Sequence, residues 1–119
     1  MDISSLDVRQ LVAEFQVFVG AFFDNIYQYA RQDLVFQLRK GKLFYLRVMA
    51  HVVWLASKKG VAPEKVGGFC AQLRKLLNNL RIEAVEQVGS ERIILIKTKP
   101  YDIFIELFGK GNVVVVDSG

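Results

Sequence analysis

The chain has little cysteine, histidine and proline: one, one and two residues among 119. A single cysteine, Cys70, excludes an internal disulfide and is typical of a reducing compartment. With only one histidine beside it, a zinc site built from several such ligands is also excluded. No apolar run approaches the roughly 18 residues of a membrane span, and no basic stretch followed by an apolar one opens the sequence. We therefore expect a cytoplasmic protein that does not enter a membrane.

Residues that could act in catalysis are equally scarce. His51 begins an apolar stretch, where a core or half-buried position is the commoner role. Cys70 falls on the apolar side of a predicted helix, where packing is the commoner role. The segment Gly109–Gly111 lies between two apolar runs, as in a tight hairpin, and lacks the strand–loop–helix setting of a phosphate-binding loop. We therefore predict no catalytic residues, no metal site and no cofactor.

What the sequence does contain is a regular alternation of helical and strand-like patterns. Ser4 and Asp7 have the spacing of a helix capping box, and apolar residues then recur every three or four positions. This predicts a helix from about Leu6 to Val19, ended by a glycine. Pro63 opens a second helical pattern, whose regular part is expected from about Phe69, because two glycines weaken its first turn.

Eight short strand patterns accompany the two helices, four after each. They are expected at 21–30, 34–39, 43–48, 51–56, 81–88, 92–98, 101–108 and 113–116. The order α-β-β-β-β-α-β-β-β-β predicts one α+β domain over residues 1–119. We expect two antiparallel sheets, arranged as a sandwich or a partly closed barrel, with the two helices covering the ends.

The net charge of +4 conceals an uneven distribution along the chain. Residues 1–38 carry two basic and five acidic side chains, residues 39–81 carry ten and one, and residues 82–119 carry four and six. A middle third this basic is suited to phosphate groups. The alternative is that lysines keep strand edges and loops soluble, and the sequence alone favours neither.

The second helix carries the most concentrated part of this charge. Arg74 and Lys75 are adjacent on it, about 100° apart, and therefore do not both face a core. Arg81 is expected at its end, where a cation stabilises the negative end of the helix dipole. These three residues and Lys58, Lys59 and Lys65 could form one phosphate-facing patch, although solvation or capping is the simpler role for each. Base stacking and packing are likewise both open for four aromatic residues: Tyr27, Tyr29, Tyr45 and Trp54.

Several short sequences occur in an order that is informative only in combination. They are Ser5-Leu6-Asp7-Val8-Arg9, Leu73-Arg74-Lys75, Arg81-Ile82, Glu91-Arg92-Ile93 and the run from Ile105 to Asp117. This order resembles the amino-terminal domain of the NFACT family, the RqcH-like and fibronectin-binding-protein-A-like proteins of ribosome-associated quality control, and looks closest to the archaeal members. The resemblance implies a shape related to the amino-terminal domain of formamidopyrimidine-DNA glycosylases. Those enzymes need an amino-terminal proline, and this chain begins Met1-Asp2-Ile3, so their activity is not transferred.

The resemblance also implies a function and site residues. Such proteins bind an obstructed large ribosomal subunit and recruit tRNA, supporting a template-free carboxy-terminal tail. Asp7, Glu91 and Arg92 match family positions that face tRNA, with Glu91 one methylene longer than the family aspartate. Together with Arg74, Lys75 and Arg81 of the basic patch, these make up the RNA-binding residues expected here: Asp7, Arg74, Lys75, Arg81, Glu91 and Arg92. The family continues past this hairpin, so we expect the chain to be part of a larger NFACT amino-terminal domain.

A different class of function is also compatible with the sequence. The strand expected at 113–116 would be the last of its sheet and would leave one edge uncovered. Such an edge can pair with a partner strand or with a second copy of the chain. The alternative to an RNA-binding module is therefore a protein-interaction module or homodimer formed through this edge.

Overall fold

The computed structural model describes residues 4–118. Two meanders, each preceded by a helix, make up this part of the chain, as the sequence predicts. The elements are α1 (Ser5–Phe15), a 3₁₀ turn (Gln16–Phe18), β1 (Phe22–Ala30), β2 (Asp33–Lys40), β3 (Lys42–Met49), β4 (Val52–Ala56), α2 (Gly68–Leu77), β5 (Ala84–Gln87), β6 (Ile93–Lys97), β7 (Tyr101–Glu106) and β8 (Asn112–Asp117). Met1, Asp2 and Ile3, which stand where the glycosylases have their amino-terminal proline, lie outside the described residues.

The strands form two antiparallel sheets that remain separate. Their orders are β1-β2-β3-β4 and β5-β6-β7-β8, so every strand lies beside its neighbour in the chain. A single bridge between Phe22 and Arg81 connects the segments that lead into the two sheets. The prediction of an α+β domain with two antiparallel sheets and two helices is confirmed, and of the two arrangements expected the sheets adopt the open one, without closing into a barrel.

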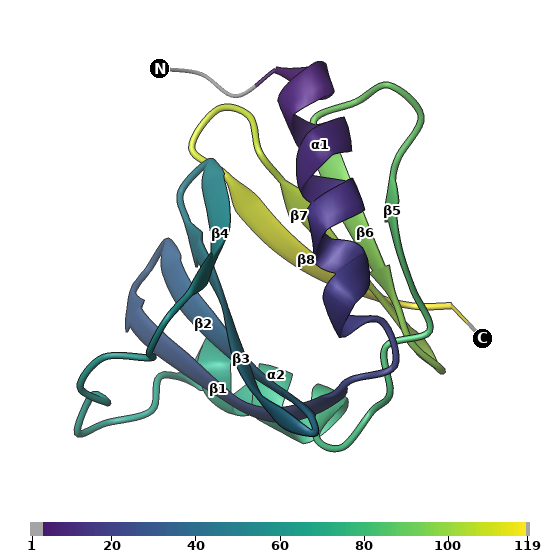
Figure 1. Ribbon diagram of the computed structural model, residues 1–119. Helices are drawn as coiled ribbons and strands as arrows, with labels where there is room; N and C mark the ends of the chain where they lie inside the picture. Colours follow the sequence, from purple (N-terminus) through teal and green to yellow (C-terminus); the bar gives the residue numbers. More distant parts are fainter. Residues whose placement is uncertain (1–3, 119) are drawn as a thin grey trace.

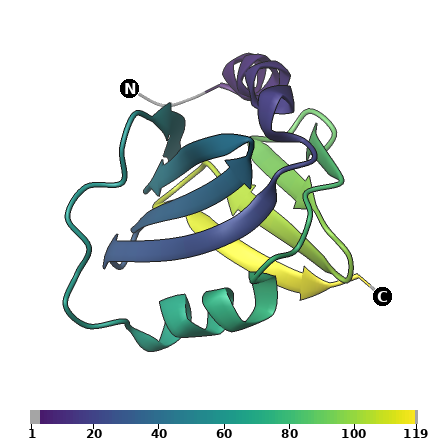
Figure 2. The same ribbon diagram turned by 60° about the horizontal axis from the view of Figure 1, so that its bottom comes forward.

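Both sheets and both helices contribute to one apolar core. Its members include Val8 and Phe15 of α1, Phe36 of β2, Leu73 of α2 and Ile103 of β7, all almost fully buried. Figures 1 and 2 show α1 against β5 and β6 on one side and α2 beside β1 on the other. The helices therefore fill the two open sides between the sheets.

Helix boundaries differ from the prediction at two places. The first helix ends at Phe15 rather than Val19, where the Gln16 side-chain amide donates to the carbonyls of Val12 and Val85, both at 2.9 Å, and a 3₁₀ turn follows. The second helix ends at Leu77, because Asn78 leaves the helical conformation and Asn79 adopts a left-handed one with φ 61°.

The fifth strand is shorter than predicted. It begins at Ala84 rather than Arg81, because residues 81–83 cross from one sheet to the other through the bridge to Phe22. The expectation that His51 is half-buried is confirmed, but it lies in the turn before β4 rather than at the start of the strand. Cys70 is buried and its thiol donates to the Ile26 carbonyl at 3.3 Å, so its packing role is confirmed as well.

Candidate nucleic-acid interface

Asp7 lies in the first turn of α1, where it completes a capping box. Its backbone N–H donates to the Ser4 hydroxyl at 3.1 Å, and the Ser4 N–H and hydroxyl donate to Asp7 Oδ2 at 2.9 and 2.8 Å. These hydrogen bonds stabilise the carboxylate and lower the pKa of Asp7 below its ordinary value of 3.8. Both bonds to the carboxylate end on Oδ2, and the side chain is exposed. The cap therefore leaves Oδ1 available for another donor.

Glu91 and Arg92 lie in the β5–β6 connection, which is held against this end of α1. The side-chain amide of Gln87 donates to the Ser5 carbonyl at 3.0 Å and to the Glu91 carbonyl at 2.8 Å. Figure 1 shows the connection beside the start of α1. The structure thus brings Asp7, Glu91 and Arg92, which the sequence separates widely, to one end of the molecule.

Arg92 is fixed more firmly than its loop position suggests. Its carbonyl accepts from the Leu107 N–H at 2.8 Å, and its guanidinium lies 6.0 Å from the centre of the Phe108 ring. Glu91 is exposed, and its N–H donates to the Val88 carbonyl at 2.9 Å. The two side chains therefore project from a backbone that is anchored on both sides.

On α2, Arg74 and Lys75 have different surroundings. Arg74 is half-buried: its Nε donates to the Ile26 carbonyl at 2.7 Å and its guanidinium lies 5.5 Å from the centre of the Tyr27 ring. Since β1 is an edge strand, this carbonyl has no partner strand, and Arg74 attaches the helix to it. Lys75 is exposed in the last turn. Arg74 is therefore first a structural residue, and Lys75 is the cation that α2 presents to solvent.

Arg81 does not have the position that the sequence predicts. The helix ends four residues earlier, so the prediction that Arg81 stabilises the helix dipole is wrong. The Arg81 side chain is exposed and forms an ion pair with Glu83 at 3.0 Å. It lies in the bridge between the two sheets and belongs to neither of the two groups described above.

The loop at 57–67, expected to add three lysines to the α2 patch, uses one of them internally. Lys59 donates from Nζ to the Tyr27 hydroxyl at 3.1 Å and lies 4.6 Å from the centre of that ring, and the bond to Tyr27 raises the pKa of Lys59. Its carbonyl accepts from the Tyr29 hydroxyl. Lys58 and Lys65 are exposed. Of the three, only these two remain for an external phosphate.

Sequence reasoning missed how thoroughly Arg47 is enclosed. Its guanidinium lies 5.4 Å from the centre of the Tyr29 ring and 5.8 Å from that of Trp54, and it donates to both carboxylate oxygens of Asp33, at 3.0 and 2.7 Å. The ion pair with Asp33 raises the pKa of Arg47. The available signal was the expected pairing of two consecutive strands, in which Arg47 lies directly opposite Trp54.

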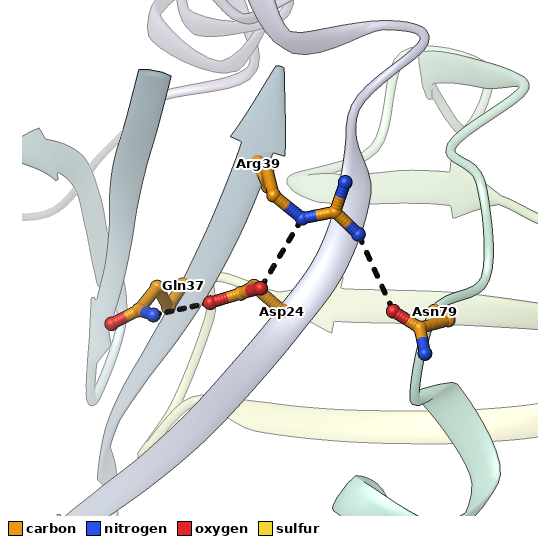
Figure 3. A network of polar contacts seen from close by, with 4 residues as sticks. All are labelled: Asp24, Gln37, Arg39 and Asn79. Atoms are coloured by element: carbon orange, nitrogen blue, oxygen red, sulfur yellow. Dashed lines mark hydrogen bonds and ion pairs between the residues drawn. The ribbon is translucent and has the colours of Figure 1, made fainter. Parts of the chain in front are cut away.

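Arg39 is occupied in a second network, shown in Figure 3. Asp24 accepts from the Gln37 amide at 2.5 Å and from Arg39 Nε at 3.3 Å, and Arg39 also donates to Asn79 Oδ1 at 3.4 Å. Lys40 likewise donates to the Val19 carbonyl at 2.7 Å. Much of the basic middle third is therefore engaged in contacts within the fold.

Five of the six predicted site residues thus fall into two groups, and Arg81 belongs to neither. One comprises Asp7, Glu91 and Arg92 at the start of α1, and the other comprises Lys75 and Arg74 on α2. Figures 1 and 2 show α1 and α2 on opposite sides of the sandwich. Across residues 4–118, we find no cluster of three or more side chains that could hold a metal ion, and no helix long and apolar enough to cross a membrane.

The comparisons with known proteins now decide the family. Residues 4–119 match the family described as NFACT N-terminal and middle domains. The chain belongs to the NFACT family. The resemblance stated from the sequence is confirmed at this level, whereas the likeness to archaeal members stays a prediction.

Individual NFACT relatives are similar over most of this chain. It is 30% identical over 125 residues to the ribosome quality control complex subunit NEMF homolog of Drosophila melanogaster, covering 96% of this chain and 12% of that protein. It is 27% identical over 115 residues to the Rqc2 homolog RqcH of Bacillus subtilis, covering 84% of this chain and 20% of that protein. This NFACT chain is therefore related to a domain of ribosome quality control proteins and spans a small part of their length.

A solved structure gives the same relationship for the fold. The N-terminal domain of the fibronectin-binding protein PavA from Streptococcus pneumoniae superimposes with a TM-score of 0.87 at 27% identity. The match covers 98% of this chain and 50% of the PavA structure. The NFACT chain described here thus corresponds to half of a solved relative.

Proposed function

We propose that this chain is an RNA-binding module of a ribosome-associated quality control factor, acting in the cytoplasm. In this proposal it contacts tRNA and large-subunit rRNA on obstructed ribosomes and so supports template-free carboxy-terminal tailing. Membership of the NFACT family and similarity to ribosome quality control proteins support the biological setting. The observation that supports this site is that the Gln87 amide holds the Glu91–Arg92 connection against the first turn of α1 by two hydrogen bonds.

The chemistry of this end suits a structured RNA. Arg92 supplies a planar donor for phosphate. Asp7 and Glu91 supply acceptors for a sugar hydroxyl or an exocyclic amino group of a base. An anchored backbone keeps these groups in place before the RNA arrives, which reduces the entropy lost on binding. The module would hold tRNA by charge and shape, without covalent chemistry of its own.

The second group of cations would supply a less specific contact. Lys58, Lys65 and Lys75 are exposed, and in residues 4–118 their side chains have no ion-pair partner. Because α2 lies on the other side of the sandwich from α1, a single RNA would have to be large to reach both groups, as tRNA or rRNA is. Contacts of this kind position a nucleic acid without reading its sequence.

The proposal is tested by the anisotropy of fluorescent tRNA across a salt series. We expect affinity that falls steeply with salt, and a loss of about tenfold for Arg92→Gln, equal to about 1.4 kcal/mol. The control is Lys42→Gln, which removes an exposed cation at the first position of β3. Lys75→Ala is a better probe of α2 than Arg74→Ala, because Arg74 also attaches the helix to β1. Absence of binding at low salt, or equal affinities of wild type and Arg92→Gln, would reject the proposal.

One observation favours a second candidate function, association through a sheet edge. β8 pairs only with β7, and Val116 near its end is 45% exposed. A partner strand, or β8 of a second copy, could add to this edge. The Ser118 N–H donates to the Pro100 carbonyl, so by alternation the N–H of Val115 faces the open edge of β8. Sedimentation would then show a dimer that persists at high salt and is lost in Val115→Pro, which removes this outward backbone donor. A monomer at all concentrations would exclude the homodimer.

A further inference from the structure

A cavity of about 340 Å³ lies outside the two groups of site residues. It is bounded by the ends of β2 and β3, the start of α2 and the β7–β8 hairpin, so it lies where elements of both sheets meet. Its volume is within the range of small-molecule sites, which is about 300–1,000 Å³. None of the six predicted RNA-binding residues lines it. It therefore requires an explanation of its own.

The inner wall of the cavity is apolar. Leu34 and Val48 line it from adjacent positions of β2 and β3, and both are almost fully buried. Phe69, at the start of α2, lines it as well but remains 43% exposed. A ring so placed has one part against the cavity and another available to a ligand. Such an arrangement suits a flat apolar group that can stack on an aromatic face.

Two cations border the same cavity, Arg31 and Lys110. Both are exposed, and neither side chain forms an ion pair or hydrogen bond within the described residues. Arg39, Arg47 and Arg74 by contrast are all occupied. No carboxylate lines the cavity; Glu106 accepts from the lining residue Asn112 at 3.3 Å, so we assign that amide no role. The cavity thus combines an apolar wall with uncompensated positive charge.

We propose that this cavity binds an unpaired nucleotide, with its base on Phe69 and its phosphate held by Arg31 and Lys110. A nucleotide combines a flat ring with an anion, which are the two features that the lining complements. The source of the nucleotide rests on the proposed RNA-binding function, whereas the site itself does not. Unpaired bases splayed from an RNA and free mononucleotides share this chemistry, and the experiment separates them.

The test follows backbone amide resonances of the isotopically labelled chain during titration with three ligands: uridine, uridine monophosphate and an unstructured penta-uridine. We expect saturable shifts at Gln32, Gly111 and Val113 with the two phosphorylated ligands, and at least tenfold weaker binding of uridine. Phe69→Ala and Arg31→Ala/Lys110→Ala should each weaken binding at least tenfold. The matched control, Arg9→Ala/Lys42→Ala, also removes one arginine and one lysine that are exposed, but neither lines the cavity.

Tighter binding of the penta-uridine than of the monophosphate would support RNA as the source, and equal binding would support a free nucleotide at the same site. No shift of the lining amides at millimolar ligand, or shifts that survive both variants, would overturn the inference. If tRNA binding depends on Arg92 but not on Phe69, and no nucleotide binds, the proposed function stands and the nucleotide site is rejected. If a nucleotide binds but tRNA does not, the nucleotide site stands and the proposed function is rejected.

Discussion

The two sheets have the same strand order, but the side chains of their strands are buried to different extents. β2 in the first sheet is buried at every position from Asp33 to Leu38, on both of its faces. The two inner strands of the second sheet, β6 and β7, are buried only at alternating positions. A strand buried on both faces needs a second covering layer. The first sheet has such a layer and the second does not.

Cations and aromatic rings form part of that extra layer. Tyr27 lies between Lys59 and Arg74, and Arg47 lies between Tyr29 and Trp54. Long basic side chains can cover apolar surface with their stems while the charged group finds a partner. The comparison teaches that a basic segment can serve packing first, so a count of its charges overstates what is left for RNA.

The largest effect should come from a side chain placed where the two sheets approach each other closely at one end. A Cβ at Gly111, in the β7–β8 hairpin, would lie 1.9 Å from the Ala50 carbonyl oxygen in the β3–β4 turn. Gly111→Ala should therefore lower the free energy of unfolding by at least about 3 kcal/mol, measured by urea denaturation. Gly109→Ala is the control: it has a similar positive φ of 60° but open space around it, so it should lose only about 1 kcal/mol. Equal losses would show that the sheets can separate here without cost.

Next in size is the difference between ion pairs on the two sheets. Arg47→Met leaves the mostly buried Asp33 without its partner, and should cost about 2 kcal/mol of unfolding free energy. Lys97→Met breaks the exposed pair with Glu86 on the second sheet, and should cost about 0.5 kcal/mol or less. Denaturation of both variants in the same buffer checks the difference. Similar values would mean that the outer layer of the first sheet contributes little.

A smaller effect is expected at the second sheet's attachment to α1. Gln87→Ala removes the hydrogen bonds to the Ser5 and Glu91 carbonyls and should cost about 1 kcal/mol. It should also weaken tRNA binding, because the Glu91–Arg92 connection loses its support. Gln28→Ala in the first sheet is the control, since its amide makes only a 3.4 Å contact with the Arg31 carbonyl. If affinity for tRNA is unchanged in Gln87→Ala, the connection does not need this support.

The smallest effect is a pH dependence from the capping box. Because the pKa of Asp7 in the folded chain is below 3.8, its carboxylate stabilises the fold fully above that pH. The contribution is lost as the pH falls through the lower folded-state pKa. The stability difference between wild type and Asp7→Ala should accordingly be constant near neutrality and shrink below pH 3.8, as urea denaturation at several pH values would show. Glu14→Ala, on the same helix but outside the box, is the control, and a difference that does not shrink would contradict the assignment.

Local features of the fold were predictable from the sequence, because local chemistry determines them. Ser4 and Asp7 marked the start of α1, and alternation along 34–39 marked β2. The burial of Val35 and Gln37 on the other face of β2 was not predictable, since it depends on side chains of other strands, such as Asp24 of β1, which accepts from the Gln37 amide. The left-handed Asn79, which ends the turn after α2, also gave no clear signal beforehand.

For the candidate site, the sequence predicted which residues belong to it better than how they are arranged. The resemblance to the NFACT family selected Asp7, Glu91 and Arg92, but nothing in the sequence marks Gln87 as the residue that brings them together. The position of Arg81 was wrong because it depended on where α2 ends. The cavity between the sheets combines residues of four segments, and such a combination leaves no local pattern.

The loop at 57–67 has a consequence for the continuity of the chain. It forms no helix or strand up to Gly67, it is attached at Lys59, and Val61 is 91% exposed. A protease could cut there without breaking a strand pairing. Each of the two pieces would carry one helix and one sheet, and both contribute to the same core, so they should stay associated and elute together in gel filtration. The molecule is thus one covalent chain made of two complementary halves, and each half supplies apolar surface that covers the other.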